Sequence, residues 1–457
     1  MTFHSCLLFS LTAFVLSKTK PPPATLILSQ LLWRHGDRSP TNLFPSYLMN
    51  RSIDSIWPMG LGALTPRGMK QHYLLGKELR KKFRGFLNET YSAREIEVIS
   101  TDYDRTLMSA QMNMAGLYGE SASSTTLSNY SIPHVPQPVP IHPDHSEMLH
   151  PGENCPAFRK EEDRVRTRSF HARQNREENG TLMRDIKYQS GNVTLTMLNI
   201  ADAVFCSEQH GIPLPRWIAD NKTIRDYLHF YYHDLSSRLY MDNDKLARLG
   251  GGPLLSVVVK KMQDKVGGKL TQKVLAYSAH DITVMALLSA MRVFDGKQPF
   301  YASLVSVDLY RSASVRPEDQ PQYFVQVRYL RGSSKPDITK AEPLDIPGCA
   351  RRCPLKKFIR LLRDSMPEDF TASCLGSSET PEAALAKDSV VLTLSMVIAL
   401  LVASLFFSCV YFLVRQRRMR NLLPTARFSL VDDGEMEASV PLTSHYDDEN
   451  MYGYNSG

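Results

Sequence analysis

The stretch Ser29–Pro40, SQLLWRHGDRSP, changes from an apolar segment to a charged one without a spacer. Within Thr25–Leu32, apolar residues occupy both odd-numbered and even-numbered positions. Because successive residues of a strand point to opposite faces of a sheet, this pattern is typical of a strand buried on both faces. Two arginines, a histidine and an aspartate follow in the segment Arg34–Arg38. Because ligands of open α/β sheets bind beyond the carboxyl ends of the strands, this charge predicts a polar site at one sheet edge.

Two later segments repeat the arrangement. A predicted strand at Glu95–Ser100 is followed by the polar run Asp102-Tyr103-Asp104-Arg105 and by a helix from Thr106 onward. A predicted strand at Lys273–Tyr277 is followed by His280-Asp281 and by an apolar helix, Ile282–Met291. Between the first two strands, Thr65-Pro66 supplies a helix N-cap and an N1 proline. Apolar residues then recur at roughly helical spacing, at Met69, Tyr73, Gly76, Leu79, Phe83 and Leu87. The pattern predicts an α/β fold with a central sheet flanked by helices.

The three strand ends bring together residues suited to an anionic substrate. Arginine offers paired donors to a phosphate and keeps its charge, and neighbouring cations lower the pKa of a histidine so that its ring stays neutral and nucleophilic in acid. A nearby carboxyl group can give a proton to a departing alcohol. Phosphoryl transfer through a phosphohistidine, with no metal, is therefore predicted for this set: Arg34, His35, Arg38, Arg105, His280 and Asp281.

These signals differ in specificity. The pattern R-H-G-x-R-x-P, which begins at Arg34, would arise by chance in this chain about once in ten thousand cases at average composition. The pair His280-Asp281 and the single Arg105 are weak by themselves, because such residues are mostly structural. Their shared strand-to-helix context carries the prediction.

Other motifs receive ordinary structural interpretations. The run Gly250–Pro253 lacks the Lys-Ser/Thr of a phosphate loop, so a turn before a helix is predicted. No metal site is predicted, because Cys349 and Cys353 lack further ligands and a set of histidines fits no ligand template. We interpret those histidines as loop residues: His134, His142, His145 and His150.

Both ends of the 457-residue chain indicate a membrane-anchored protein with a cleaved signal peptide. Cys6–Leu16 is a short apolar region followed by small residues, which predicts a signal peptide, and Ser389–Val414 is an uncharged span of membrane length. The following arginines, Arg415, Arg417, Arg418 and Arg420, place the C-terminus in the cytosol, in type I orientation. The net charge of +7 is mild and not clustered in the body of the chain, so a nucleic-acid partner is not expected.

Sequons and cysteines agree with a lumenal body. None of the predicted glycosylation sites lies beyond the span: Asn50, Asn88, Asn129, Asn179, Asn192 and Asn221. Five cysteines between signal and span imply disulfides and one unpaired thiol: Cys155, Cys206, Cys349, Cys353 and Cys374. Residues 121–185 are rich in Pro, Ser, His and charge, and helical periodicity returns at Val193–Phe205, so the middle of the chain is interpreted as a cap over the core.

The sequence resembles the histidine acid phosphatases, most closely the lysosomal and prostatic group. The resemblance runs from about Leu31 to Cys374 and is carried by LLWRHGDRSP, WPMGLGALTPRGM, ISTDYDRTLMSA, VFCSEQHG, KLARL, YSAHD, PFYAS and IPGCARRCPL. It implies a phosphoglycerate-mutase-like large α/β domain with a smaller, mainly helical cap, metal-free hydrolysis of phosphomonoesters in acid, and a homodimer. By the resemblance, His35 is the nucleophile and Asp281 the proton donor, and the phosphate is held by Arg34, Arg38, Arg105 and His280. The implied disulfides are Cys155–Cys374 and Cys349–Cys353.

The sequence departs from the family pattern at three places. Ile282 stands where the family usually has the first of two threonines after His-Asp, and Leu304 stands where the usual partner of Cys206 would be. Cys206 is therefore expected to be a buried, inert thiol. Phe428-Ser429-Leu430-Val431 occupies the place of the tyrosine-based sorting signal, so the choice between lysosome and plasma membrane stays open.

The prediction is a membrane-anchored acid phosphatase that hydrolyses phosphate monoesters of small molecules, with phosphoproteins as a further substrate class and no cofactor. An inositol-phosphate phosphatase, mutase or phosphotransferase of the same superfamily is the first alternative, and a catalytically inactive receptor on this scaffold is the second. The predicted organisation is a signal peptide at 1–17, a lumenal domain at 18–374 with a cap insertion at roughly 121–235, a stalk at 375–388, a transmembrane helix at 389–414 and a cytosolic tail at 415–457.

Overall fold

The computed structural model of the chain divides into two units, Met1–Thr380 and Pro381–Gly457. The residues that the structure describes are 24–49, 51–119, 137–144, 146, 148–192, 194–235, 237–240, 243–313, 322–375 and 381–420. The predicted signal peptide, Asn50, Asn129, His134, His145 and the tail from residue 421 onward, with its sorting segment at Phe428, lie outside these ranges.

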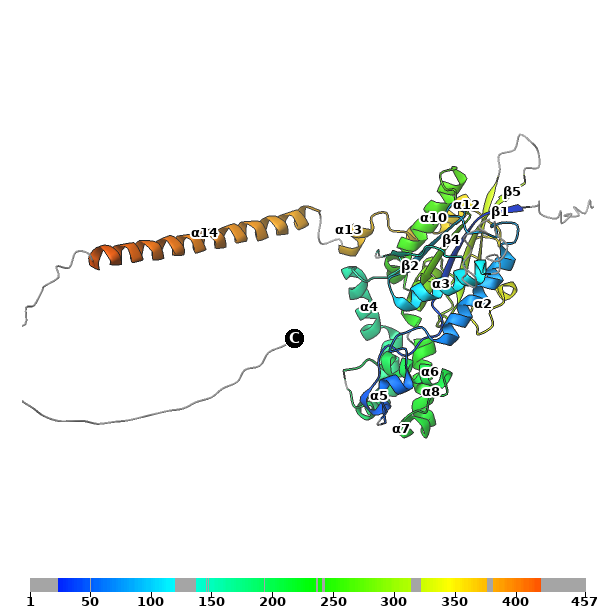
Figure 1. Ribbon diagram of the computed structural model, residues 1–457, viewed down its shortest axis with the longest axis horizontal. Helices are drawn as coiled ribbons and strands as arrows, with labels where there is room; N and C mark the ends of the chain where they lie inside the picture. Colours follow the sequence, from blue (N-terminus) through cyan, green and yellow to red (C-terminus); the bar gives the residue numbers. More distant parts are fainter. Residues whose placement is uncertain are drawn as a thin grey trace, which may run out of the picture. The chain divides into compact units, whose positions relative to one another are not determined.

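The first unit is built on a mixed β-sheet (Figure 1). Its described strands run in the order β3-β2-β4-β1-β5-β6-β7, and β8 pairs with β6 at one end of that strand. The strands are β1 (Ala24–Arg34), β2 (Ile96–Thr101), β3 (His142–Asp144), β4 (Val274–Ala279), β5 (Leu304–Ser312), β6 (Tyr323–Leu330), β7 (Glu342–Leu344) and β8 (Cys353–Pro354).

Strand β1 lies at the boundary between two kinds of pairing. It pairs in parallel with β4, which pairs in parallel with β2, whereas it pairs antiparallel with β5 on its other side. The carboxyl ends of β1, β2 and β4 therefore lie at the same edge of the sheet. This is the edge at which the sequence predicts the polar site.

Helices cover both faces of the sheet, as the sequence predicts (Figure 1). Leu31 and Trp33 of β1 pack with helices α2 and α3, whereas Leu28 and Leu32 pack with α10, α11 and α12. Burial on both faces confirms the interpretation of the opening apolar run, and β1 continues to Arg34, two residues beyond the predicted Leu32. These helices are α2 (Pro66–Lys82), α3 (Asp104–Tyr118), α10 (Gly252–Val266), α11 (Asp281–Ala290) and α12 (Leu355–Leu361).

The glycine run at Gly250–Gly252 is helical, so the prediction of a turn there is wrong. A π-helical segment, Ala247–Gly251, continues directly into α10. A Cβ on Gly251 would lie 2.0 Å from the carbonyl oxygen of Ala286 in α11. The glycines therefore serve close packing of two helices, which outweighs their poor helix propensity.

A second group of helices forms the smaller part of the first unit. Helices α5 to α8 share an apolar cluster with Phe44, Tyr47 and Trp57 of the loops after β1. The predicted helix at Val193–Phe205 is α6, which runs from Met197 to Gln209. The helices are α4 (Pro156–Arg168), α5 (Phe170–Ser190), α6 (Met197–Gln209), α7 (Arg216–Ala219) and α8 (Lys222–Phe230), with a π-helical segment at Tyr231–Leu235 and short helices α1 (Ile53–Ile56), α9 (Asp244–Leu246) and α13 (Phe370–Leu375).

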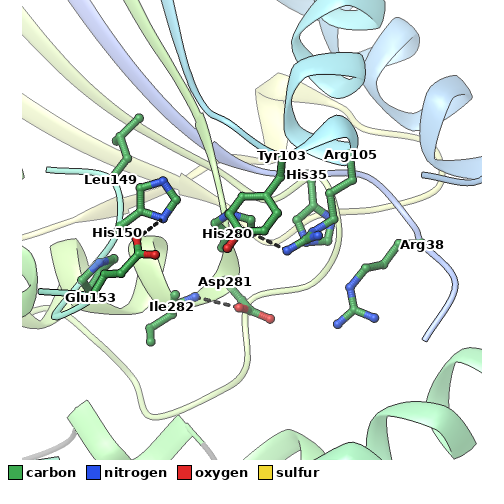
Figure 2. Close-up of a pocket in the computed structure, with 11 residues that line it drawn as sticks. His35, Arg38, Tyr103, Arg105, Leu149, His150, Glu153, His280, Asp281 and Ile282 are labelled. Carbon is green, nitrogen blue, oxygen red and sulfur yellow. Dashed lines mark hydrogen bonds and ion pairs between the residues drawn. The ribbon is translucent and has the colours of Figure 1, made fainter. Parts of the chain in front are cut away.

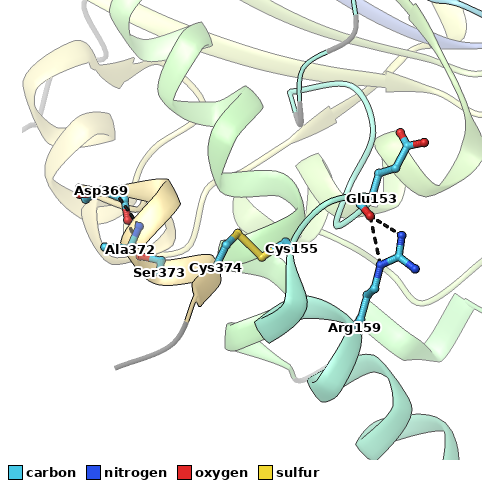
Figure 3. The surroundings of a disulfide bond; sticks show 7 residues. All are labelled: Glu153, Cys155, Arg159, Asp369, Ala372, Ser373 and Cys374. Carbon is cyan, nitrogen blue, oxygen red and sulfur yellow. Dashed lines mark hydrogen bonds between the residues drawn. A yellow bond between two sulfur atoms is a disulfide. The ribbon is translucent and has the colours of Figure 1, made fainter. Parts of the chain in front are cut away.

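The described residues contain two disulfides, which join the pairs that the resemblance implies. Cys155, the N-cap of α4, is bonded to Cys374 in α13 across 219 residues of chain (Figure 3). Cys349 is bonded to Cys353. Cys206 is a free, buried thiol.

The second unit contains helix α14 (Pro381–Arg420). Its segment Ser395–Arg418 has a mean hydropathy of 2.7 and is long and apolar enough to cross a membrane. This segment overlaps the predicted span 389–414, and α14 begins inside the predicted stalk.

Candidate active site

The carboxyl ends of β1, β2 and β4 meet at a cavity of about 290 Å³ (Figure 2). Five of the six predicted site residues line it, namely His35, Arg38, Arg105, His280 and Asp281. The sixth, Arg34, is buried behind them, with its Nη2 atom 2.7 Å from Oδ2 of Asp281. The structure thus brings together residues from positions 34 to 281 of the chain, as the sheet topology requires.

His35 is fixed by backbone contacts on both sides. Its N–H donates to the carbonyl of Ala279 at the end of β4 (2.9 Å), and its carbonyl accepts from the N–H of Ala302 (3.1 Å). The next residue must be glycine, because a Cβ on Gly36 would lie 2.5 Å from the carbonyl oxygen of Gly68 in α2. Helix α2 therefore packs closely against the loop that follows β1 and carries His35.

The orientation of the His35 ring leaves one nitrogen for chemistry. Nδ1 lies 2.7 Å from the carbonyl oxygen of Gly36, to which it can only donate. In the neutral ring Nε2 then carries the lone pair. Burial, followed by the charges of Arg34 and Arg105, lowers the pKa of His35 well below its usual value. The ring is therefore neutral and nucleophilic even in acid.

Arg38 is held by a carboxylate that sequence reasoning did not identify. Its Nη1 and Nη2 atoms each donate at 3.0 Å to the two carboxylate oxygens of Asp202 in α6. Asp202 is 4% exposed and also accepts from the N–H of Thr41 (3.2 Å). The bidentate pair joins the helical part of the unit to the loop that follows β1.

Arg34 and Asp281 form the second buried pair of the site. The Arg34 guanidinium also donates to the carbonyl of Pro299 (2.5 Å) and lies 4.3 Å from the centroid of the Tyr301 ring. Asp281 is the first residue of α11, and its Oδ1 accepts from the N–H of Ile282 (2.8 Å). Burial acts to raise the pKa of Asp281, but the cations of Arg34 and Arg38 outweigh it and lower the pKa. These two cations therefore favour the ionised form of Asp281.

Arg105 and His280 complete the cavity. Nη2 of Arg105 lies 3.4 Å from Nδ1 of His280, whose Nε2 lies 3.1 Å from Oγ1 of Thr101. Because Thr101 donates to Thr106, its oxygen accepts from His280, which places the proton of the neutral ring on Nε2. Burial and the charge of Arg105 lower the pKa of His280 to about 3. Burial and the charge of Arg38 lower the pKa of Arg105 to about 10, so it stays cationic in acid.

Unpaired donors mark the cavity as an anion site. Within the described part of the chain, the buried Nε atoms of Arg34, Arg38 and Arg105 have no hydrogen-bond partner. A buried donor without a partner costs about 1–3 kcal/mol. Of these three cations, Arg38 and Arg105 line the cavity and are suited to the oxygens of a phosphate group, and Arg34 lies behind them.

Asp37, the acidic residue of the opening stretch, faces away from the cavity. Its carboxylate accepts from Oγ1 of Thr65 (2.5 Å) and pairs with Nε2 of His210 (2.6 Å). Thr65 is also the N-cap of α2, as the sequence predicts, and its Oγ1 accepts from the N–H of Gly68 (3.2 Å). Asp37 therefore anchors the loop, and the acidic residues that line the cavity are Asp281 and Glu153.

Sequence reasoning missed four residues around the site. Tyr103, His150 and Glu153 line the cavity, and Asp202 holds Arg38. His150, interpreted as an ordinary loop residue, pairs through Nδ1 with Oε2 of Glu153 at 3.2 Å (Figure 2). The described residues contain no group of three His, Cys, Asp or Glu side chains placed to hold a metal ion.

Comparison with known proteins identifies a family. Residues 25–329 match the model of the "Histidine phosphatase superfamily (branch 2)". The chain is 36% identical to lysosomal acid phosphatase of Rattus norvegicus over 77% of this chain and 81% of that protein. It is 33% identical to prostatic acid phosphatase of Bos taurus, over 75% and 86% respectively. A phytase of Hafnia alvei in complex with tartrate has a similar fold, with a TM-score of 0.54 at 17% identity over 78% of this chain and 99% of that one.

Proposed function

Because this chain belongs to branch 2 of the histidine phosphatase superfamily, we propose that it hydrolyses phosphate monoesters through a phosphohistidine on His35. The chain is accordingly a phosphoric monoester hydrolase of the acid phosphatase type, like its relatives at about one third identity. The phytases match at 17% identity or less and share the fold alone, so the inositol-phosphate alternative has weaker support.

One observation carries the proposal. A buried imidazole, His35, with its Nε2 lone pair unused, stands beside guanidinium groups whose Nε–H groups are unpaired. Neutral imidazole is a nucleophile, and guanidinium groups stabilise the charge on the equatorial oxygens of a transferring phosphoryl group. The filled catalytic positions also argue against an inactive receptor.

In the first step, Nε2 of His35 attacks phosphorus and the bond from phosphorus to the ester oxygen breaks. Arg34, Arg38 and Arg105 hold the phosphoryl oxygens, and Asp281 gives a proton to the departing alkoxide. His280 orients Arg105 in the tautomer described above, and it joins the phosphate contacts when its Nδ1 carries a proton. In the second step, water attacks the phosphohistidine, the phosphorus–nitrogen bond breaks, and Asp281 takes a proton from that water. The products are an alcohol and inorganic phosphate.

Substrate binding prepares Asp281 for this role. Asp281 is ionised at rest because Arg34 stabilises its negative charge. A phosphate dianion that binds Arg34 shares that cation with the carboxylate and adds a like charge nearby. Both effects raise the pKa of Asp281, so that it takes up a proton in an acidic compartment.

Two substitutions test these roles. His35→Ala should abolish turnover and the phosphorylated intermediate, which is trapped by acid quench during turnover of a ³²P-labelled ester. Asp281→Asn should slow alkyl phosphates about 10²–10⁴-fold and p-nitrophenyl phosphate much less, because only a poor leaving group needs the proton. His229→Ala, in a half-exposed pair with Glu208, is the matched control. Label on no histidine, or equal losses for both leaving groups, would contradict the assigned roles.

The proposal includes a type I orientation in the lysosomal or plasma membrane. Support comes from the apolar segment Ser395–Arg418 and from the positions of the sequons. Asn88 and Asn221 are exposed, and Asn179 and Asn192 are half-buried. Glycosidase treatment of the full chain should lower its apparent mass, and protease added to intact vesicles should remove only the tail. A homodimer and phosphoprotein substrates are further parts of the proposal, supported by the family resemblance.

A further inference from the structure

A second cavity, of about 250 Å³, adjoins the phosphate cavity. Arg38, Asp281 and Ile282 line both cavities, whereas His35, Arg105 and His280 line only the first. Of the proposed phosphate-binding residues, Arg38 therefore stands at the boundary between the two cavities. Space beside a reacting phosphoryl group is where the remainder of a substrate must lie.

The position of Asp281 links this space to the leaving group. A proton donor must lie within hydrogen-bond reach of the ester oxygen, so the first carbon of the alcohol lies beside the Asp281 carboxyl group. Oδ2 of Asp281 accepts from Nε2 of Gln298 at 2.7 Å, and Gln298 lines the second cavity but not the first. The carboxyl group thus contacts a wall of the second cavity directly.

Three apolar side chains form another wall of the second cavity. They are Leu198 of α6 and Ile282 and Met285 of α11. Met285 is 6% exposed and belongs to an apolar cluster with the Cys155–Cys374 disulfide, and Ile282 packs against the same cluster. Ile282 and Met285 are therefore supported from behind by this cluster, whereas Leu198 packs against the apolar cluster of helices α5 to α8.

The opposite end of the phosphate cavity is polar. His150 and Glu153 form their ion pair there, on the other side of Asp281 from Arg38 in Figure 2. An alcohol beside Asp281 meets either the His150–Glu153 pair, with Leu149 and Pro151 next to it, or the second cavity, where three apolar side chains lie among polar ones such as Arg166 and Asn199. The apolar surface of Leu198, Ile282 and Met285 favours an apolar alcohol in the second cavity, because contact with these side chains removes apolar surface from water.

We propose that the second cavity receives the alcohol of the substrate, and that Leu198, Ile282 and Met285 make the enzyme selective for phosphate monoesters of apolar alcohols. The inference rests on the proposed function and adds the substrate class. Ile282 is central to it, since it lines both cavities at the position where the family resemblance predicts a threonine. Burial of one methylene group corresponds to about a threefold to fourfold gain in kcat/KM.

The test measures kcat/KM for ethyl, propyl, butyl and pentyl phosphate with the full-length protein in detergent. For the wild type, kcat/KM should rise about threefold to fourfold for each methylene until the cavity is filled. Ile282→Thr and Leu198→Gln should each flatten this slope. Ile53→Thr, a half-buried isoleucine in α1 that lines neither cavity, should keep it.

Two further measurements separate the possible results. His150→Gln should leave the slope unchanged, so flattening in this variant alone, or a flat wild-type slope, would overturn the inference. Thermal unfolding with butylphosphonate and methylphosphonate measures binding without turnover, and the wild type should be stabilised more by the butyl compound. If the wild type hydrolyses no ester, the proposed function fails; if it hydrolyses all of them equally, only this inference fails.

Discussion

Replacement of Asp202 by asparagine tests how the cavity holds its cations in the absence of substrate. Asp202 and Arg38 are 4% and 8% exposed, and two bonds of 3.0 Å join them. Asp202→Asn keeps the shape of the side chain but leaves a buried guanidinium without a counter-charge. A phosphate ion bound in the cavity can supply that charge, so the effect should depend on ligand.

The expected loss of stability follows from the burial of the pair. Removal of one partner from a buried ion pair costs about 3–5 kcal/mol, and the remaining amide oxygen places this variant near the lower value. In a unit of this size a loss of about 3 kcal/mol lowers the unfolding midpoint by about 4 °C. Saturating phosphate should remove a large part of the deficit, and inorganic phosphate should inhibit the variant at lower concentration than the wild type.

The assay is thermal unfolding of the full chain in detergent, followed by tryptophan fluorescence with and without phosphate. All three tryptophans lie in the first unit, at Trp33, Trp57 and Trp217, so the signal reports that unit. Asp345→Asn is the control, because Asp345 and Arg351 form an exposed pair at 3.4 Å that should contribute less than about 1 kcal/mol. A midpoint for Asp202→Asn equal to that of the control, or a deficit that phosphate does not reduce, would refute the reasoning.

Two other substitutions, His72→Gln and Gly36→Ala, should change stability in ways that can be measured. His72 is fully buried, and burial lowers its pKa to about 4. Between about pH 6.5 and pH 4 the unfolded chain therefore binds more protons at this residue than the folded chain does. The free energy of unfolding falls as the pH drops in this window, by up to about 1.4 kcal/mol per pH unit from this group. His72→Gln should therefore show a smaller fall in unfolding midpoint between pH 7 and pH 4.5, and an unchanged fall would contradict the assignment. Gly36→Ala places a Cβ against the carbonyl of Gly68, so this variant should have a lower kcat and a free energy of unfolding lower by about 1–3 kcal/mol. Full activity would show that α2 does not fix the His35 loop.

The sequence predicts those helices and strands whose apolar residues are the ones buried against the rest of the fold. Strand β1 carries apolar residues toward both faces, and α2 begins at the predicted Thr65. Helices α4 and α5 were not predicted, because most of their residues are charged or polar and few are buried, so no apolar period was visible. The run Gly250–Gly252 was assigned to a turn because its packing partner, Ala286, lies far along the chain.

The same limit applies to the site. The residues after the ends of β1, β2 and β4 could be found because strand ends of a parallel sheet converge. Asp202 could not be placed, since its partner Arg38 is 164 residues away. One signal was present: Asp202 is the single charged residue in the apolar segment Met197–Cys206, and a buried carboxylate requires a cation.

The two buried pairs of the site hold Arg34 and Arg38 in place in the absence of substrate. Asp202 orders Arg38 and Asp281 orders Arg34 before substrate arrives, so less side-chain entropy is lost on binding. The two carboxylates differ in how substrate binding affects them. Asp202 keeps both oxygens on Arg38, whereas Asp281 has one oxygen on Arg34 and Gln298 and stands at the entrance of the second cavity. In the proposed mechanism, competition for Arg34 acts on Asp281, which would gain its proton when the phosphate arrives and lose it when the alcohol departs; this coupling would favour turnover in acid.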